Sequence, residues 1–132
     1  MKSEFNFPSK IENVSYVEKL VDDLCGKYEL SSEIYGNMMV AVVEAVNNAI
    51  LHGNKLDPEK LVYVAYSIDG DYLTFFIKDE GKGFEFDEIP DPTLPENIEK
   101  PHGRGIFLMK HLVDEIKFNH HGAEVELKFK IK

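Results

Sequence analysis

The strongest constraint on the fold is a change of hydrophobic period at Asp57-Pro58. Before this point, apolar residues recur every three or four positions, which predicts two helices, over residues 11–28 and 31–53. After it, two short runs rich in β-branched and aromatic residues predict a hairpin of strands over 61–68 and 72–78. The chain therefore combines long helices with neighbouring strands, as α+β proteins do.

Further segments extend this pattern on both sides. Phe5 and Phe7 alternate with polar residues before Pro8, which predicts a short edge strand. Residues 105–113 have a helical pattern, and 116–119 with 125–131 form a second predicted hairpin. We therefore expect residues 1–132 to form one α+β domain, a two-layer sandwich in which a mixed or antiparallel sheet is covered on one face by three helices.

The composition narrows the classes of function. The formal net charge is −9, and such an acidic chain offers no basic surface for nucleic acid. No signal-peptide pattern or membrane-spanning apolar run is evident, so we expect a cytoplasmic protein that does not bind membranes. The single cysteine, Cys25, lies on the apolar side of a predicted helix. It is interpreted as a buried hydrophobic residue in a reducing compartment.

A polar stripe marks one face of the second predicted helix. Glu44, Asn48 and His52 are four residues apart, and Asn47 lies beside them. Most such stripes are solvated faces, but this one has two adjacent asparagines in mid-helix and no basic residue. The amide oxygen of Asn48 suits Mg²⁺, and Glu44, one turn away, could accept a proton from an attacking hydroxyl. His52 needs no catalytic explanation.

Two glycine-bearing segments offer sites for a ligand. The first, Asp79-Glu80-Gly81-Lys82-Gly83, follows a strand, where the glycines allow close backbone approach and Asp79 can accept a hydrogen bond from an amino group. The second, His102-Gly103-Arg104-Gly105, opens a predicted helix, and its backbone amides suit phosphate. Either could be a simple turn, and the second matches neither a Walker A nor a Rossmann motif. Between them, residues 85–102 have prolines and no period, which predicts a mobile lid.

These motifs together resemble the GHKL ATPase superfamily. Residues 44–53, with the sequence EAVNNAILHG, look like its N box, and 79–84 and 103–109 resemble its first and second glycine boxes. The short chain and the GRGIFLM run followed by Asp114-Glu115 most resemble the bacterial anti-sigma-factor serine kinases. The resemblance spans about residues 5–130, with 85–100 as the ATP lid.

The resemblance implies a Bergerat ATP-binding fold with ATP and Mg²⁺ as ligands. Asn48 would hold Mg²⁺, and Glu44 would act as the base or orient the hydroxyl. Asp79 would accept the adenine amino group, with Gly81 and Gly83 lining the base and ribose.

The resemblance also implies a phosphate site and protein partners. Gly103 and Gly105 would donate backbone amides to the phosphates, and Arg104 or Lys100 could add charge. The usual target is a serine on an anti-anti-sigma protein, and the usual captive is a sigma factor. A homodimer is a further possibility.

One position departs from the family pattern. The last hairpin commonly contains Gly-Thr, whose threonine helps to fix adenine, whereas here Gly122 is followed by Ala123. Three functions therefore compete: a serine kinase that also sequesters a sigma factor, an ATP-dependent binding regulator without transfer activity, and a module of a histidine-kinase or gyrase-type ATPase. Chain length and Glu44 disfavour the third function, and the Glu44–Asn48 pair favours the first.

Overall fold

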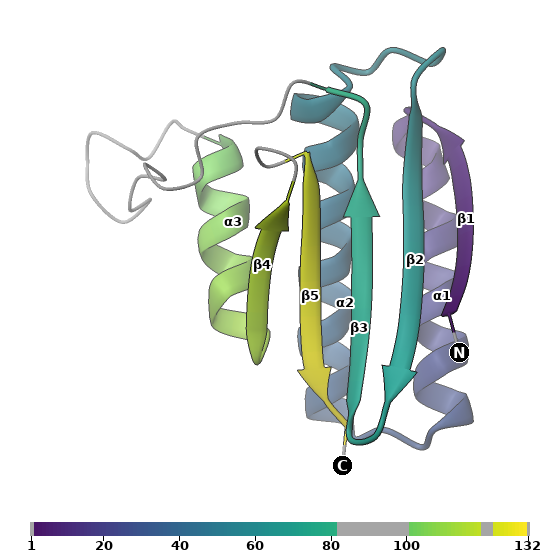
Figure 1. Ribbon diagram of the computed structural model, residues 1–132, viewed down its shortest axis with the longest axis vertical. Coiled ribbons are helices and arrows are strands. Elements are labelled where there is room, and N and C mark those ends of the chain that lie inside the picture. The colour runs from purple at the N-terminus through teal and green to yellow at the C-terminus, as the bar shows by residue number, and fades with distance from the viewer. Residues whose placement is uncertain (1, 82–100, 120–122, 132) are drawn as a thin grey trace.

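The computed structural model describes residues 2–81, 101–119 and 123–131, with the backbone alone for residues 2–3 and 101–106. Strands and helices alternate in blocks along the chain, as Figure 1 shows. The elements are β1 (Lys2–Pro8), a 3-10 turn (Ile11–Asn13), α1 (Val14–Lys27), α2 (Ser32–Asn48), a π-helical segment (Ala49–Gly53), β2 (Leu61–Asp69), β3 (Tyr72–Lys78), α3 (Pro101–Leu112), β4 (Glu115–Asn119) and β5 (Glu124–Lys130).

The five strands form one antiparallel sheet in the order β1-β2-β3-β5-β4. Strand β3 lies at the centre, and its alternate residues Leu73, Phe75 and Ile77 are buried. This period of two places one face of the sheet in the core, because successive side chains point to opposite faces. Phe75 packs edge to face on Phe129 of β5 at 6.0 Å between ring centroids.

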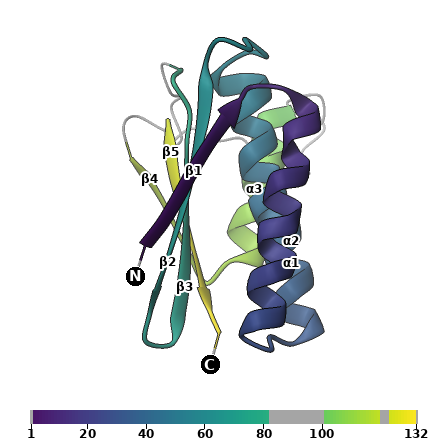
Figure 2. The same cartoon turned by 90° about the vertical axis from the view of Figure 1, so that its right-hand side faces the viewer.

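Helices α1, α2 and α3 cover that face, so the described part of the chain has two layers (Figure 2). Helix α2 packs against both α1 and α3 and also contacts β3 and β5. It begins at a capped end, where the Ser31 hydroxyl accepts a hydrogen bond from the Ile34 N–H at 3.2 Å. Its apolar side faces the core through Met38, Ala41, Val42, Ala45 and Val46.

Helix α2 does not end at a simple cap. Its last turn widens into the π-helical segment Ala49–Gly53, closed by the Asn54 N–H donating to the Ala49 carbonyl at 2.8 Å. The next two residues, Lys55 and Leu56, have φ of 52° and 60°, in the left-handed region. Insertions of this kind often occur at functional sites. In this protein the π-helical segment and the residues after it reverse the chain direction, and they bring Gly53 and Asn54 to the end of the sheet.

The expected fold is confirmed: a two-layer α+β sandwich with three helices on one face. The described sheet is wholly antiparallel rather than mixed. Helix α3 begins at Pro101, four residues earlier than the predicted 105. Proline is tolerated at a first helical position, where its missing N–H has no helical partner in any case. The predicted lid, over 85–100, and Gly122 lie outside the described residues.

The apolar character of α2 is explained by its place in the core. The stretch Ser32–Gly53 has the length and the mean hydropathy, 1.3, of a membrane-spanning helix, contrary to our expectation from sequence. It packs against the sheet and two helices, however, with its apolar side in the core, and core helices share this composition. The expectation for Cys25 agrees with its burial, which raises the pKa of its thiol and disfavours a reactive thiolate.

Candidate functional site

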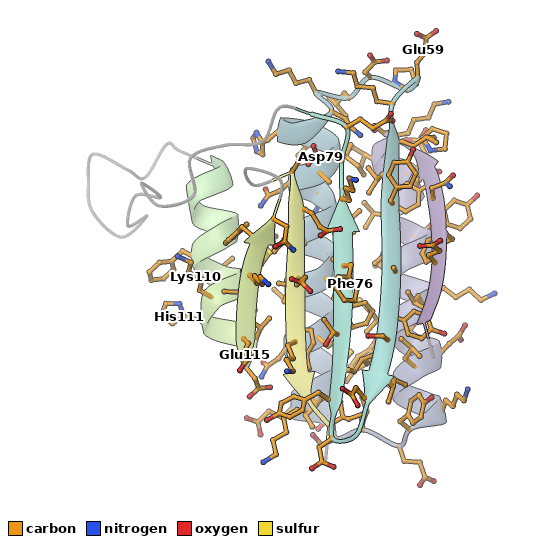
Figure 3. All side chains as sticks on the ribbon, in the orientation of Figure 1. Glu59, Phe76, Asp79, Lys110, His111 and Glu115 are labelled. Carbon is orange, nitrogen blue, oxygen red and sulfur yellow. The ribbon has the colours of Figure 1, made fainter. Side chains whose placement is uncertain are left out.

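Three features named from sequence gather at one end of the molecule. Asp79 directly follows β3, as Figure 3 shows, and the C-terminal end of α2 lies at the same end of the structure. The N-terminal end of α3 also points there (Figure 1). The fold therefore brings together the polar end of α2 and the two glycine-bearing segments, which are far apart in the sequence.

Asp79 is a buried carboxylate, with 8% of its surface exposed. Its backbone N–H donates to the carbonyl of Ala123 at 2.9 Å, which ties it to the start of β5. Its Oδ1 accepts a hydrogen bond from the Gly81 N–H at 2.7 Å. Burial raises the pKa of Asp79, and the Gly81 N–H and the charge of Lys60 oppose that rise only in part. A buried carboxylate with spare acceptor capacity suits a ligand that offers an N–H donor.

Two glycines allow the chain to pack closely around this carboxylate. A Cβ on Gly53 would lie 2.3 Å from Asp79 Cγ, and one on Gly81 would lie 2.2 Å from the Gly53 carbonyl oxygen. Real Cβ atoms do not approach other atoms so closely. Glycine is therefore required at Gly81, where the obstacle is backbone and cannot rotate away.

Asn54 connects the end of α2 to this loop and is itself buried, with 1% exposed. Its Oδ1 accepts a hydrogen bond from the Glu80 N–H at 2.8 Å, and its Nδ2 donates to Ser9 Oγ at 2.7 Å and to the Leu61 carbonyl at 2.9 Å. The Glu80 carboxylate accepts a hydrogen bond from the Leu61 N–H. Asn54, Ser9, Leu61 and Glu80 are called the Asn54 network below.

The predicted polar stripe is only partly solvated. Glu44, Asn47 and Asn48 are half-buried, and His52 is exposed and makes contacts with its surroundings. Asn48 Nδ2 is buried and, within the part of the chain that the structure describes, has no hydrogen-bond partner. Such a group costs free energy unless something satisfies it, so the amide is suited to a ligand.

Asn48 is the residue of the site that the sequence assigns to a metal ion. Among the described residues no group of three or more His, Cys, Asp or Glu side chains could hold a metal ion. Asn48, whose Nδ2 has no hydrogen-bond partner among the described residues, also carries an amide oxygen, which is a hard ligand of the kind that Mg²⁺ accepts. Mg²⁺ fits such a site, because it commonly keeps waters and takes one or two protein ligands together with substrate phosphates.

The second glycine segment forms the beginning of α3 rather than a loop before it. Gly103 and Arg104 fall within the first four residues of Pro101–Leu112, and Gly105 is the next residue. N–H groups in a first helical turn have no partner within the helix, and the helix dipole is positive there. This end of α3 therefore offers donors for an anion.

The structure thus brings three segments that carry predicted residues to one end of the molecule. They are the C-terminal part of α2 with Glu44 and Asn48, the turn after β3 with Asp79 and Gly81, and the start of α3 with Gly103, Arg104 and Gly105. Gly83 and Lys100 lie outside the described residues. Sequence reasoning missed Asn54 and the role of Gly53. The only local signal was a glycine and an asparagine at a helix end, which by themselves indicate a cap.

A five-stranded antiparallel sheet under three helices, with a buried carboxylate beside two glycines at one end, defines the class of GHKL-type ATPase domains. The family model described as the histidine kinase-like ATPase domain matches residues 7–129. The chain therefore belongs to this family, and the resemblance drawn from its motifs is confirmed.

Curated relatives place the chain near one branch of that family. It is 28% identical over 122 residues to the serine-protein kinase RsbW of Oceanobacillus iheyensis, covering 88% of this chain and 77% of the relative. It is 32% identical over 123 residues to the anti-sigma F factor of Bacillus cytotoxicus, covering 89% of this chain and 83% of that protein.

A solved structure shares the fold. The chain is similar to the crystal structure of the RsbU and RsbW domains of a Mycobacterium tuberculosis protein, with a TM-score of 0.70 and 16% identity. The match covers 99% of this chain but about a third of that longer chain, 32%. At this identity the likeness shows a common fold alone.

Proposed function

We propose that this protein is an ATP-dependent serine kinase that phosphorylates an anti-anti-sigma protein and sequesters a sigma factor. The names of its relatives, serine-protein kinase and anti-sigma F factor, support both halves of this function. The observation that carries the proposal is the buried Asp79 carboxylate, which follows β3 at the end of the molecule where the C-terminal end of α2, with Asn48, also lies.

ATP would be held by its base and by its phosphates. Asp79 would accept the adenine amino group, and Gly81 and Gly83 would line the base and ribose. The backbone amide of Gly103, in the first turn of α3, would bind a phosphate oxygen, with Gly105 two residues further on and added charge from Arg104 or Lys100. The residues that recognise the base and those that recognise the phosphates therefore come from different segments.

Asn48 would hold Mg²⁺ through its amide oxygen. The bound ion supplies charge neutralisation at the phosphates and leaves the protein little covalent chemistry to perform. Glu44, one helical turn before Asn48, accepts the proton of the serine hydroxyl. The serine oxygen bonds to the γ-phosphorus, the bond to the β-phosphate oxygen breaks, and ADP leaves.

The acidic chain suits protein partners. With a net charge of −9, it regulates transcription by holding a sigma factor rather than DNA, and it acts in the cytoplasm. A homodimer is part of the proposal, because β1 and β4 each have an unpaired edge in the described sheet.

A second function has one observation in its favour. Ala123 presents its backbone carbonyl to the Asp79 N–H but has no hydroxyl to support the carboxylate. Weaker adenine binding would suit a regulator that binds ATP and its partner without transferring phosphate.

Phosphoryl transfer distinguishes the two functions. The partner is recovered by pull-down from the native cell, identified by mass spectrometry and incubated with radiolabelled ATP and the wild type or Glu44→Gln. We expect label on a partner serine, slowed about a hundred- to ten-thousand-fold in Glu44→Gln. Glu33→Gln, the same change at an exposed position in the first turn of α2, is the control and should keep full transfer. Tight ATP binding by the wild type without any transfer would favour the non-catalytic regulator.

A further inference from the structure

We propose that Asn54 is a positioning residue that holds the Asp79–Gly81 loop in register and thereby determines the selectivity of the site for adenine over guanine. This role rests on the proposed function, because it assumes that Asp79 reads the base. The observation behind it is a buried asparagine whose amide joins three separate segments of the chain.

The Asn54 network holds the loop through both the backbone and the side chain of Glu80. The Glu80 N–H is held by Asn54 Oδ1 at 2.8 Å, and the Glu80 carboxylate accepts the Leu61 N–H. Asn54 in turn donates to the Leu61 carbonyl at 2.9 Å. These three residues close a ring of hydrogen bonds, so the loop cannot shift along the strand direction without breaking at least one of them.

Glu80 lies between the two residues that shape the base site. Asp79 precedes it, and Gly81 follows it with its N–H 2.7 Å from Asp79 Oδ1. A displacement of Glu80 therefore moves both the Asp79 carboxylate and the Gly81 N–H that orients it. Asn54 also follows Gly53, whose Cα leaves no room for a side chain next to Asp79 Cγ.

Only an amide meets the demands of this position. The Glu80 N–H needs an acceptor, whereas Ser9 Oγ and the Leu61 carbonyl need donors. A buried side chain must satisfy all three, because 1% exposure leaves no access for bulk water. Asn54 supplies one carbonyl oxygen and two N–H groups, which meets the requirement.

The consequence is selective for one base. Adenine presents an amino group that a carboxylate can accept, whereas guanine presents a carbonyl oxygen in the same place, which a carboxylate repels. Phosphates and ribose are the same in ATP and GTP. A loop displaced by about 1 Å therefore weakens ATP binding and leaves GTP binding almost unchanged, since such misplacement can cost up to about a hundredfold.

The test is the ratio of Kd for GTP to Kd for ATP, measured by calorimetry well below the Tm of every variant. We expect Asn54→Ala to lower this ratio roughly tenfold or more. Ser9→Ala is the matched control, because it removes one hydrogen bond of the Asn54 network but keeps the contact to Glu80. It should lower Tm and leave the ratio unchanged.

Two further variants keep the test decisive. Asn54→Asp retains an acceptor for the Glu80 N–H and should keep more of the ratio than Asn54→Ala. Asn54→Ser, which leaves space for a water, replaces the alanine variant if that one does not fold. Asp79→Asn could lose the selectivity for ATP over GTP while Asn54→Ala and Asn54→Ser keep it. That result would overturn the positioning role of Asn54 and leave the proposed function standing. Absence of ATP binding by the wild type would overturn the proposed function as well.

Discussion

Gly81→Ala should damage both the fold and the nucleotide site. An added Cβ would lie 2.2 Å from the Gly53 carbonyl oxygen and 2.8 Å from the Gly53 carbonyl carbon. Ordinary contacts begin at 3.4 Å, so the two backbones must separate by about 1.2 Å. Neither atom is on a side chain that could rotate away, and both segments are fixed by hydrogen bonds of the Asn54 network.

The size of the effect follows from that separation. Overpacking of this kind costs about 1–3 kcal/mol, which at roughly 4 °C for each kcal/mol lowers Tm by about 4–12 °C. The same movement displaces the Asp79 carboxylate, because its hydrogen bond from the Gly81 N–H is 2.7 Å long and cannot stretch by that amount. We therefore expect Kd for ATP to rise roughly tenfold to a hundredfold.

The assay is thermal unfolding followed by calorimetric titration with Mg²⁺ and ATP. Gly36→Ala is the control, because it lies in α2 and an added Cβ there meets nothing within 4 Å. It should raise stability by up to about 1 kcal/mol and leave Kd unchanged. If Gly81→Ala kept the wild-type Tm and Kd, the close approach of the two glycines could not be a requirement of the site.

Four other perturbations have defined outcomes. Burial raises the pKa of Asp79 in the folded protein above its ordinary value of 3.8, so the protonated carboxyl contributes to stability at acidic pH. This contribution should fall as the pH rises through the folded pKa. It is measured as the free energy of unfolding of the wild type against that of Asp79→Asn at each pH. Asn48→Ala should impair Mg²⁺-dependent ATP binding, while Glu44→Gln slows transfer and keeps Kd, as titration and transfer assays would reveal. Phe75→Ala, fully buried, should lower the free energy of unfolding in urea by about 3–5 kcal/mol.

The sequence predicted the described elements well where a single period governs them. Strands β2 and β3 lie within one residue of their predicted ranges, because β-branched and aromatic residues mark both runs and burial alternates strictly along β3. Helix α3 was predicted to start four residues late, since Pro101, Gly103 and Gly105 read as a connection. Contact with α2 outweighs the low helix propensity of those glycines.

The site was predictable in its parts but not in its supports. Asp79 and Gly81 are recognisable because their types and spacing form a local motif. Two of the three partners of Asn54 are 45 and 26 residues away, at Ser9 and Glu80, so no local pattern could indicate its role. The π-helical turn that brings Gly53 against Asp79 arises from tertiary packing and has no sequence period of its own.

The central claim is that the end of the sheet marked by Asp79 binds ATP with Mg²⁺. The most direct test is a calorimetric titration of the wild type and Asp79→Asn with ATP, each with and without Mg²⁺. We expect a saturable heat for the wild type that requires Mg²⁺ for full affinity, a rise in Tm on binding, and a much weaker interaction for Asp79→Asn. No heat and no thermal shift for the wild type at millimolar nucleotide would contradict the claim.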